Sequence, residues 1–321
     1  MAVSKLSQIT PASTFPGMTD TVVGVTAAGA DVLYTGVQLF QALVTQGLRV
    51  VLKANTTIYL ATTGNDSVPY VAMSSGNPWA TLNKAWSFIC STFDLAGFTV
   101  TVQMADGTYS GLQVGAAVSG LSGTPNGGGN IIFQGNTSDY TKVVISDTNN
   151  PFAFASMITS ALTFSYLTLN STLGTNYLID VQSPCVVNIS GVLGCEVVGV
   201  YAFSAYGGGA QINFIGSTIN FLGSPTYFGV LAAQAGGLIS FFNNTGLNTF
   251  AVPSGTLTVS TGFANAVATG QIETTGAAFS GTVSGPRYNC TLNGVINTFG
   301  SGSTYFPGSS SGTTSTGGQY A

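Results

Sequence analysis

A short apolar segment recurs along the second half of the chain at a nearly constant interval. Its central aliphatic residues are Leu162, Val187, Ile212, Ile239, Ile272 and Ile296. Successive copies lie about 25 residues apart, with one longer interval between Ile239 and Ile272, and this spacing falls within the range of solenoid repeats. A tandem unit of this length cannot bury its apolar side chains alone and buries them by stacking on its neighbours. The repeat therefore predicts a solenoid in which each period is one coil of about three short strands.

Tyrosines repeat at a similar interval, at Tyr177, Tyr201 and Tyr227. Gly, Ser and Asn between the strand segments suit turns that need left-handed backbone geometry. A β-sandwich, with a strand about every 8 to 12 residues, is the alternative fold. The regular interval and the restriction of helical patterns to the start of the chain favour the solenoid. The fold class that we predict is all-β, a parallel β-helix.

Charge is scarce, and this limits the possible partners. Only 5% of the residues are charged, 45% are hydrophobic, and the net charge is −4. A disordered chain would need more charge and less hydrophobicity, and no apolar run is long enough to span a bilayer. Six basic residues provide no electrostatic surface for nucleic acid or an anionic membrane. We expect neither nucleic-acid binding nor membrane insertion, and the absence of an apolar export segment at the N-terminus predicts synthesis in a cytoplasm.

Residues 1–55 are predicted to form a small β/α head. Strands are expected at Asp20–Val25 and Val32–Tyr34, followed by a helix at Gly36–Gln46 with an apolar stripe. So small a unit cannot bury enough surface to offset its chain entropy. We therefore expect the head to need partner chains.

The remaining chain divides into three parts. Residues 56–110 contain strand patterns on either side of one amphipathic helix, in which Leu82, Ala85, Trp86 and Ile89 share a face behind an N-cap at Thr81. Residues 111–299 hold the coils. Residues 300–321 are rich in Gly and Ser, a composition typical of a flexible tail.

Several short motifs between Thr57 and Tyr109 lie in a fixed order. These are Ile58-Tyr59-Leu60, Gly64-Asn65-Asp66, Gly76-Asn77-Pro78-Trp79-Ala80-Thr81-Leu82, Lys84-Ala85 and Asp106-Gly107-Thr108-Tyr109. This run resembles the entry of pectin-lyase-like right-handed β-helix proteins, where a capping helix leads into the first coil. The resemblance implies a right-handed helix, but it does not imply an activity, because lyases, hydrolases and inert fibres share this entry.

Both ends of the chain resemble phage tail-fibre proteins. The opening SKLSQITPASTFPGMTDTVVGVTAAGADVLYTGVQLFQAL is similar to their attachment segments, and GTTSTGGQYA is similar to their termini. The resemblance implies a structural virion protein, made in the host cytoplasm, whose partners are two further copies in a homotrimer, other virion proteins and a host-surface glycan or receptor. A head fibre or decoration protein of the same fold is an alternative. The implied attachment residues are Val22, Val25, Leu39, Phe40 and Leu43.

Catalytic chemistry has weak support in the sequence. A glycoside hydrolase needs two carboxyl groups about 5 to 9.5 Å apart. Asp180 and Glu196 are the weak candidates for a depolymerase, but a separation of less than one coil predicts that they lie on different faces. Asp139 and Asp147 flank a strand-like segment and are expected in turns, and Asp106 is expected to form a turn beside Gly107. A lyase of this fold would imply a calcium-binding acidic cluster and a basic residue, for which the charges are too dispersed.

No metal or cofactor is expected. There is no histidine, and the four cysteines lack CxxC spacing. We expect buried, reduced thiols, with a Cys185–Cys195 disulfide as the alternative.

Aromatic residues are the remaining candidates for contact with a ligand. Tyr201, Tyr206, Tyr227 and Phe228 could form a sugar platform, although aromatics on successive coils more often fill a core. A receptor contact is predicted near the C-terminus, at Tyr288, Tyr305 and Phe306, which would be distal if the head anchors the protein.

Overall fold

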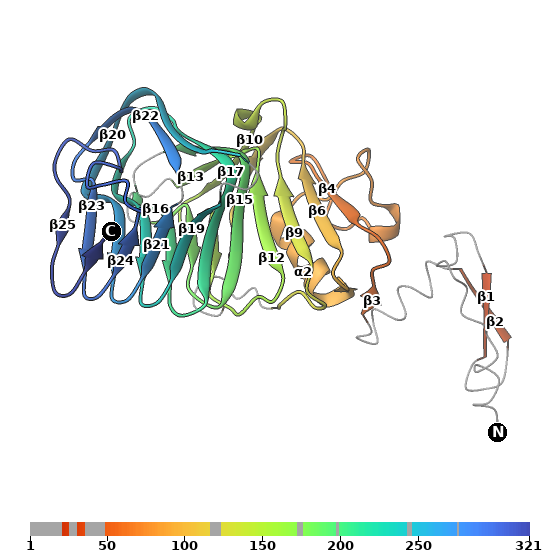
Figure 1. The fold of residues 1–321 in the computed structure, drawn as a ribbon. Coiled ribbons are helices and arrows are strands. Elements are labelled where there is room, and N and C mark those ends of the chain that lie inside the picture. The colour runs from red at the N-terminus through yellow and green to blue at the C-terminus, as the bar shows by residue number, and fades with distance from the viewer. Residues whose placement is uncertain are drawn as a thin grey trace.

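The computed structural model describes residues 21–25, 31–35, 49–115, 123–171, 176–196, 199–242, 246–274 and 276–321. Most of the strands in these ranges belong to one sheet of parallel strands, which winds into a β-solenoid of about seven turns (Figure 1). The prediction of an all-β parallel β-helix is therefore confirmed, and the alternative sandwich is wrong.

The coils place their strands in three parallel stacks. The first stack consists of β4 (Thr56–Leu60), β6 (Thr99–Met104), β9 (Asn130–Gln134), β12 (Ala161–Ser165), the first halves of β15 (Cys185–Glu196) and β17 (Ala210–Phe221), β19 (Leu238–Phe242), β21 (Gln271–Thr274), β24 (Val295–Asn297) and β26 (Gln319–Tyr320). The second consists of β7 (Gly107–Tyr109), β10 (Val143–Asp147), β13 (Leu167–Ser171), the second halves of β15 and β17, and the first parts of β20 (Asn248–Val267) and β22 (Ala277–Ser284). The third consists of β8 (Leu112–Val114), β11 (Phe152–Phe154), β14 (Ile179–Val181), β16 (Gly199–Tyr206), β18 (Thr226–Gln234), the end of β20, β23 (Tyr288–Thr291) and β25 (Thr313–Thr314).

The repeat found in the sequence is the register of the first stack. Successive partners are Val100, Ile131, Leu162, Val187, Ile212, Ile239, Ile272 and Ile296, and all of them are fully buried. The structure confirms the predicted alignment and extends it upstream by two coils. The tyrosine repeat holds for only one step: Tyr177 and Tyr201 stack with ring centroids 6.1 Å apart, whereas Tyr201 lies opposite Gly229 and Tyr227 opposite Gly199.

Aromatic rings from neighbouring coils fill the interior. Phe164 stacks on Phe133 at a centroid distance of 5.1 Å and contacts Phe152 at 4.3 Å. Strands alternate in the expected way, since Val100 and Val102 are buried in β6 while the residues between them are partly exposed. The core is therefore one continuous apolar column, built by stacking of the coils.

Helix α2 (Leu82–Thr92) begins at Thr81, whose side chain accepts a hydrogen bond from the Lys84 amide at 3.1 Å. The predicted face is confirmed, because Leu82, Ala85, Trp86 and Ile89 are all buried. The Trp86 ring lies 6.1 Å from Phe154, so the helix packs against the start of the aromatic column. Asp66 fixes the turn before the helix by accepting from the amide of Ala80 and the hydroxyl of Thr81. The entry motif therefore has a structural role.

The longest interval of the repeat, from Ile239 to Ile272, contains β20. Its first residues pair in the second stack and its last residues in the third. Between them Thr256–Thr258 pair with Thr282–Ser284 of β22, in a side extension that rises at the upper left of Figure 1.

The Gly/Ser-rich end continues the solenoid. β25 pairs with β23, and β26 pairs with β24. Both the amide and the hydroxyl of Thr298 donate to the carbonyl of the final residue, Ala321. Short hydroxyl side chains and glycines form the last coil here, although their composition is typical of a flexible tail.

The head is described only as a hairpin. β1 (Thr21–Val25) pairs antiparallel with β2 (Asp31–Thr35), which confirms both predicted strands. The predicted helix at residues 36–46 lies outside the described residues. β3 (Val50–Val51) pairs in parallel with β5 (Phe93–Asp94), the strand directly after α2. No helix in the described ranges is long and apolar enough to cross a membrane.

Candidate functional site

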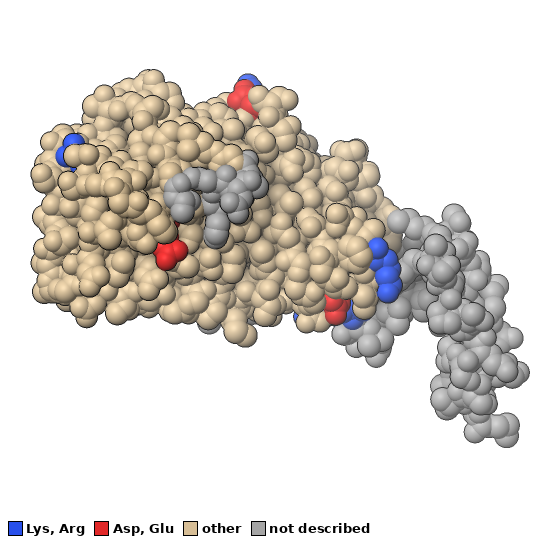
Figure 2. All heavy atoms as spheres, in the orientation of Figure 1, with Lys and Arg blue, Asp and Glu red and all other residues tan. Residues whose placement is uncertain are grey.

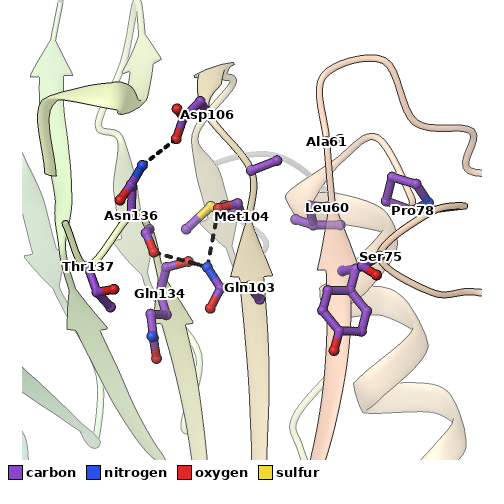
Figure 3. Close-up of a pocket in the computed structure, with 13 residues that line it drawn as sticks. Leu60, Ala61, Ser75, Pro78, Gln103, Met104, Asp106, Gln134, Asn136 and Thr137 are labelled. Carbon is purple, nitrogen blue, oxygen red and sulfur yellow. Dashed lines mark hydrogen bonds between the residues drawn. The ribbon is translucent and has the colours of Figure 1, made fainter. Parts of the chain in front are cut away.

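A groove of about 560 Å³ lies where β4, β6 and β9 end and the chain turns towards the second stack (Figure 3). Three successive coils line it, and Ser75 and Pro78 from the entry segment close one side. The groove exists because strands of the first stack end in register, so that their turns lie side by side.

Two amide side chains occupy equivalent positions in this groove, since Gln103 and Gln134 are paired across β6 and β9. The Gln103 amide nitrogen donates to the carbonyls of Met104, Gln134 and Gly135, at 3.3, 3.3 and 3.0 Å. These bonds fix the Gln103 side chain against the turns (Figure 3). The floor of the groove thus contains one fixed side-chain amide, that of Gln103.

A carboxylate lies at the rim, on the turn after β6. The Asn136 side chain donates to Asp106 Oδ1 at 2.8 Å, which joins the turns of two neighbouring coils. Asp106 therefore occupies a turn, as predicted, and also faces a ligand-sized groove, which the sequence did not indicate. The signal that could have indicated the groove is the recurrence of Gln at the same strand position one coil later, at Gln103 and Gln134.

The lining residues can bind an uncharged, hydroxyl-rich ligand. Amides and a carboxylate provide hydrogen bonds, and Tyr59 contributes an aromatic ring. Among these lining residues Asp106 is the only carboxyl group, whereas both hydrolytic mechanisms need a pair. The groove therefore offers hydrogen-bonding groups and one aromatic ring to a ligand.

A second, smaller cavity of about 320 Å³ lies beside the start of α2. Hydroxyl and amide side chains line it, among them Thr81, Asn83, Thr108 and Ser110. Thr81 is already engaged as the helix cap, and the lining residues include no ionisable group except Tyr109. We therefore regard the first groove as the candidate site.

The two weak catalytic candidates belong to different stacks. Asp180 lies on β14 in the third stack, opposite Ser204, and Glu196 lies at the end of β15 in the second stack, opposite Asn170. This is the separation onto different faces that their spacing predicts.

Each of these carboxyl groups has its own local partners. Asp180 is 1% exposed, and burial raises the pKa of its carboxyl group, while hydrogen bonds from Gln182 and Ser204 act in the opposite direction. Glu196 accepts from the Asn170 side chain at 3.3 Å. The structure thus does not join the two into an acid–base pair.

Asp139 and Asp147 are turn formers, as predicted. Asp139 caps the short 3-10 helix η3 (Tyr140–Lys142) by accepting from the Thr141 amide, and Asp147 accepts from the amides of Gly111 and Asn149.

The aromatic platform is divided between core and surface. Tyr227 is 1% exposed and belongs to the core, and Tyr201 is 6% exposed. Phe228 and Tyr206 are about half exposed, at 48% and 51%. Tyr201 meets Phe228 edge to face at 5.7 Å. Four rings on one surface are therefore excluded, and ligand contact through Phe228 or Tyr206 stays a prediction.

The three C-terminal aromatics mostly fill the last coils. Phe306 is fully buried, and Tyr288 is 8% exposed and stacks on Tyr320 at 3.9 Å. The Tyr305 hydroxyl is held by Thr274 Oγ1 and by the amide of Ala277. The expectation that all three face a receptor is therefore wrong for Phe306, whose ring packs on other core phenylalanines. The sequence shows aromatics near an end but not which of them close the core.

Of the predicted attachment residues, Val22 and Val25 lie on β1, and Leu39, Phe40 and Leu43 lie outside the described residues. Their role in attachment stays a prediction.

All four cysteines are buried and free, so the alternative Cys185–Cys195 disulfide is not formed. Burial raises the pKa of the Cys90 and Cys185 thiols to about 12, which keeps both groups protonated near neutral pH. Within the described ranges, no group of three or more Cys, Asp or Glu residues could hold a metal ion.

Comparisons with protein-family models, with curated proteins and with solved structures found no match to this chain.

Proposed function

We propose that this chain is a structural, non-catalytic protein of a phage virion, the shaft of a trimeric tail fibre or spike that attaches the particle to a host-surface glycan. The observation that carries the proposal is a long parallel solenoid in which Asp106, Asp180 and Glu196 belong to three separate hydrogen-bonded arrangements. A shaft needs a continuous core and needs no reactive pair. The resemblance of both chain ends to tail-fibre proteins supports the virion assignment.

The groove at the ends of β4, β6 and β9 is our candidate for glycan contact. The amide oxygen of Gln103, the Gln134 side chain and the Tyr59 ring suit the hydroxyls and the apolar faces of sugar rings. Asp106 adds a charge-assisted acceptor, which strengthens a hydrogen bond from a sugar hydroxyl.

Electron microscopy of phage particles labelled with gold-conjugated antibody against the purified chain tests the virion assignment. Gold at the tail supports the fibre or spike. Gold on the head supports the alternative, a head fibre or decoration protein of the same fold. Label that stays with host membranes and leaves particles bare contradicts the proposal.

A depolymerase is the second candidate, with Asp180 and Glu196 as its candidate catalytic carboxyl groups, although Asp180 is 1% exposed and the two lie in different stacks. Incubation of the protein with host capsule or lipopolysaccharide tests it. Release of reducing ends or unsaturated uronates that disappears in Asp180→Asn would establish the depolymerase and refute a non-catalytic shaft. Unchanged polysaccharide supports the shaft.

A further inference from the structure

The hydrogen bonds inside the groove at the ends of β4, β6 and β9 determine which groups it offers to a ligand. The side-chain NH2 group of Gln103 donates to three backbone carbonyls, so its amide oxygen, Oε1, is the atom that remains for a ligand. The Asn136 side chain is engaged on both sides, because Nδ2 donates to Asp106 and Oδ1 accepts from two backbone amides of the following turn. Both amides therefore direct their NH2 groups at the protein itself.

The Asp106 carboxylate is a second acceptor with a defined position (Figure 3). The bond from Asn136 holds Oδ1 at 2.8 Å and leaves Oδ2 for a ligand. A carboxylate accepts hydrogen bonds and donates none, and the bonds that it accepts from charged donors are strong. No Lys or Arg belongs to the residues that line the groove. The other lining residues with polar side chains are uncharged, namely Tyr59, Ser75, Gln134 and Thr137.

Few other charges compete with this carboxylate. Only 5% of the residues are charged, and Figure 2 shows how sparsely such side chains are distributed over the visible face of the coils. The Lys84 ammonium group lies over the Trp79 ring, 5.2 Å from its centroid. Hydrogen bonds from Thr141 lower the pKa of Asp139, and the charge of Lys142 adds to this effect. Both of these basic residues thus have partners outside the lining of the groove.

We propose that the groove prefers saccharides with free amino groups, accepts neutral ones and discriminates against acidic ones. An ammonium group donates hydrogen bonds and has the charge opposite to that of Asp106, whereas a uronate or a phosphate brings acceptors to acceptors and is repelled. At about 5 Å in water, attraction or repulsion between two unit charges changes affinity roughly fourfold. Amino-bearing and acidic saccharides should therefore differ in affinity by about tenfold or more at low salt. The inference deepens the proposed function, on which it rests for a glycan as the ligand.

An array of immobilised bacterial polysaccharides, probed with the fluorescently labelled full chain, tests this inference. The array carries neutral members, members with free amino groups and members with carboxylates or phosphates. It is read at a pH at which the amino groups are protonated, at low and at high salt. Charge recognition weakens in high salt, whereas contacts with neutral hydroxyls do not depend on it.

Three variants locate the effect. Asp106→Asn removes the charge and keeps an oxygen that accepts from Asn136. Asp139→Asn is the matched control, because it removes the same charge from a neighbouring turn outside the groove and keeps an oxygen for the Thr141 amide. Gln134→Lys adds a charged donor inside the groove. Circular dichroism verifies the fold of each variant.

We expect the wild type to bind amino-bearing members about tenfold more tightly than acidic ones, and high salt to reduce this ratio. Asp106→Asn should abolish most of the preference, Asp139→Asn should keep it, and Gln134→Lys should gain binding to acidic members. Tightest binding of the wild type to acidic members, a ratio that Asp106→Asn leaves unchanged, or no binding to the array would each overturn the inference.

Gold labelling of phage particles separates this inference from the proposed function. Labelled particles together with any of the contrary array results would remove the specificity of the groove and leave the virion role standing. Bare particles together with the expected ratios would remove the virion role and support the specificity of the groove.

Discussion

Phe164 is the position where the aromatic column can be tested most directly. It lies on β12, is fully buried, and contacts rings from the coil below and from another stack. Its ring stacks on Phe133 at an interplanar angle of 8°, and it approaches Phe152 at 4.3 Å and Phe154 at 6.1 Å. Phe164→Ala removes the ring and leaves a cavity at the centre of the column.

The expected loss of folding stability is large, because we expect the surrounding coils not to collapse into the space that the ring leaves. Replacing a buried Phe by Ala costs about 3 to 5 kcal/mol, which includes the cavity. Aromatic pairs contribute about 0.5 to 1.5 kcal/mol each beyond burial, and three pairs place Phe164 at the upper end of that range. We expect Phe164→Ala to lower the free energy of unfolding by about 4 kcal/mol. Phe164→Leu, which keeps most of the volume, should cost less than about 1.5 kcal/mol.

Urea unfolding monitored by far-UV circular dichroism measures the loss. Fluorescence adds a local probe, because both tryptophans, Trp79 and Trp86, lie at the start of the solenoid. Coincidence of the two transitions is needed before a single free energy is assigned, since coils of a solenoid can unfold separately. Phe228→Ala is the matched control, because that ring is 48% exposed. If Phe164→Ala costs less than about 1 kcal/mol, or no more than Phe228→Ala, the column does not support the fold as argued.

Three further predictions concern single positions, and thermal unfolding measures each of them. Burial raises the pKa of the Asp180 carboxyl group in the folded protein. Its contribution to stability should therefore be greatest below pH 3.8, the ordinary pKa of aspartate, and should fall as the pH rises from 3.8 through the pKa of Asp180 in the folded protein. Asp180→Asn should remove that fall, and a pH dependence identical to that of the wild type would refute the reasoning. Gly64→Ala should lower the free energy of unfolding by about 1 to 3 kcal/mol, because a Cβ at this position would collide with the carbonyl oxygen of Trp79. Gly208→Ala is the control and should be tolerated, because no atom lies near the place of its Cβ. Equal losses of stability in the two variants would contradict this. Leu292 is exposed and has a φ of 52°, a left-handed backbone conformation that Asn adopts at a lower energetic cost than Leu. Leu292→Asn should therefore raise the free energy of unfolding by up to about 1 kcal/mol. A lower melting temperature of this variant would contradict the reasoning.

The stacking of the coils could be read from the sequence because it depends on one residue in each period. A branched aliphatic side chain such as Val187 or Ile212 must return to the same inward position in every coil, so its spacing records the register. Tyr227 did not follow this rule, because a turn between stacks can shift an aromatic along its strand without exposing the core. The side extension of β20 was visible only as a long interval, since pairing outside the three stacks leaves no periodic signal.

The candidate site was harder to predict than the fold. Its residues come from the ends of three strands, and their closeness depends on the exact point at which each strand turns. Asp106 looks like any turn former in sequence, and only the neighbouring coil brings Asn136 to it. The burial of Phe306 was equally hidden, because a Gly/Ser-rich segment gives no indication that it continues the solenoid.

The position of the groove changes how a fibre of this chain would touch a glycan. Phe306 and Tyr288 are buried, which removes most of the aromatic surface expected at the C-terminal coils. The groove lies in the coils next to α2, so a bound glycan would lie along the flank of the shaft. A single groove with few hydrogen-bonding groups binds weakly, but the proposed trimer would present one groove per copy on the same shaft. Linked sites of this kind raise overall affinity by about 10² to 10⁴ without any new contact, provided that one polysaccharide can reach more than one groove. Attachment by such a shaft would therefore depend on its oligomeric state more strongly than on any single side chain in the groove.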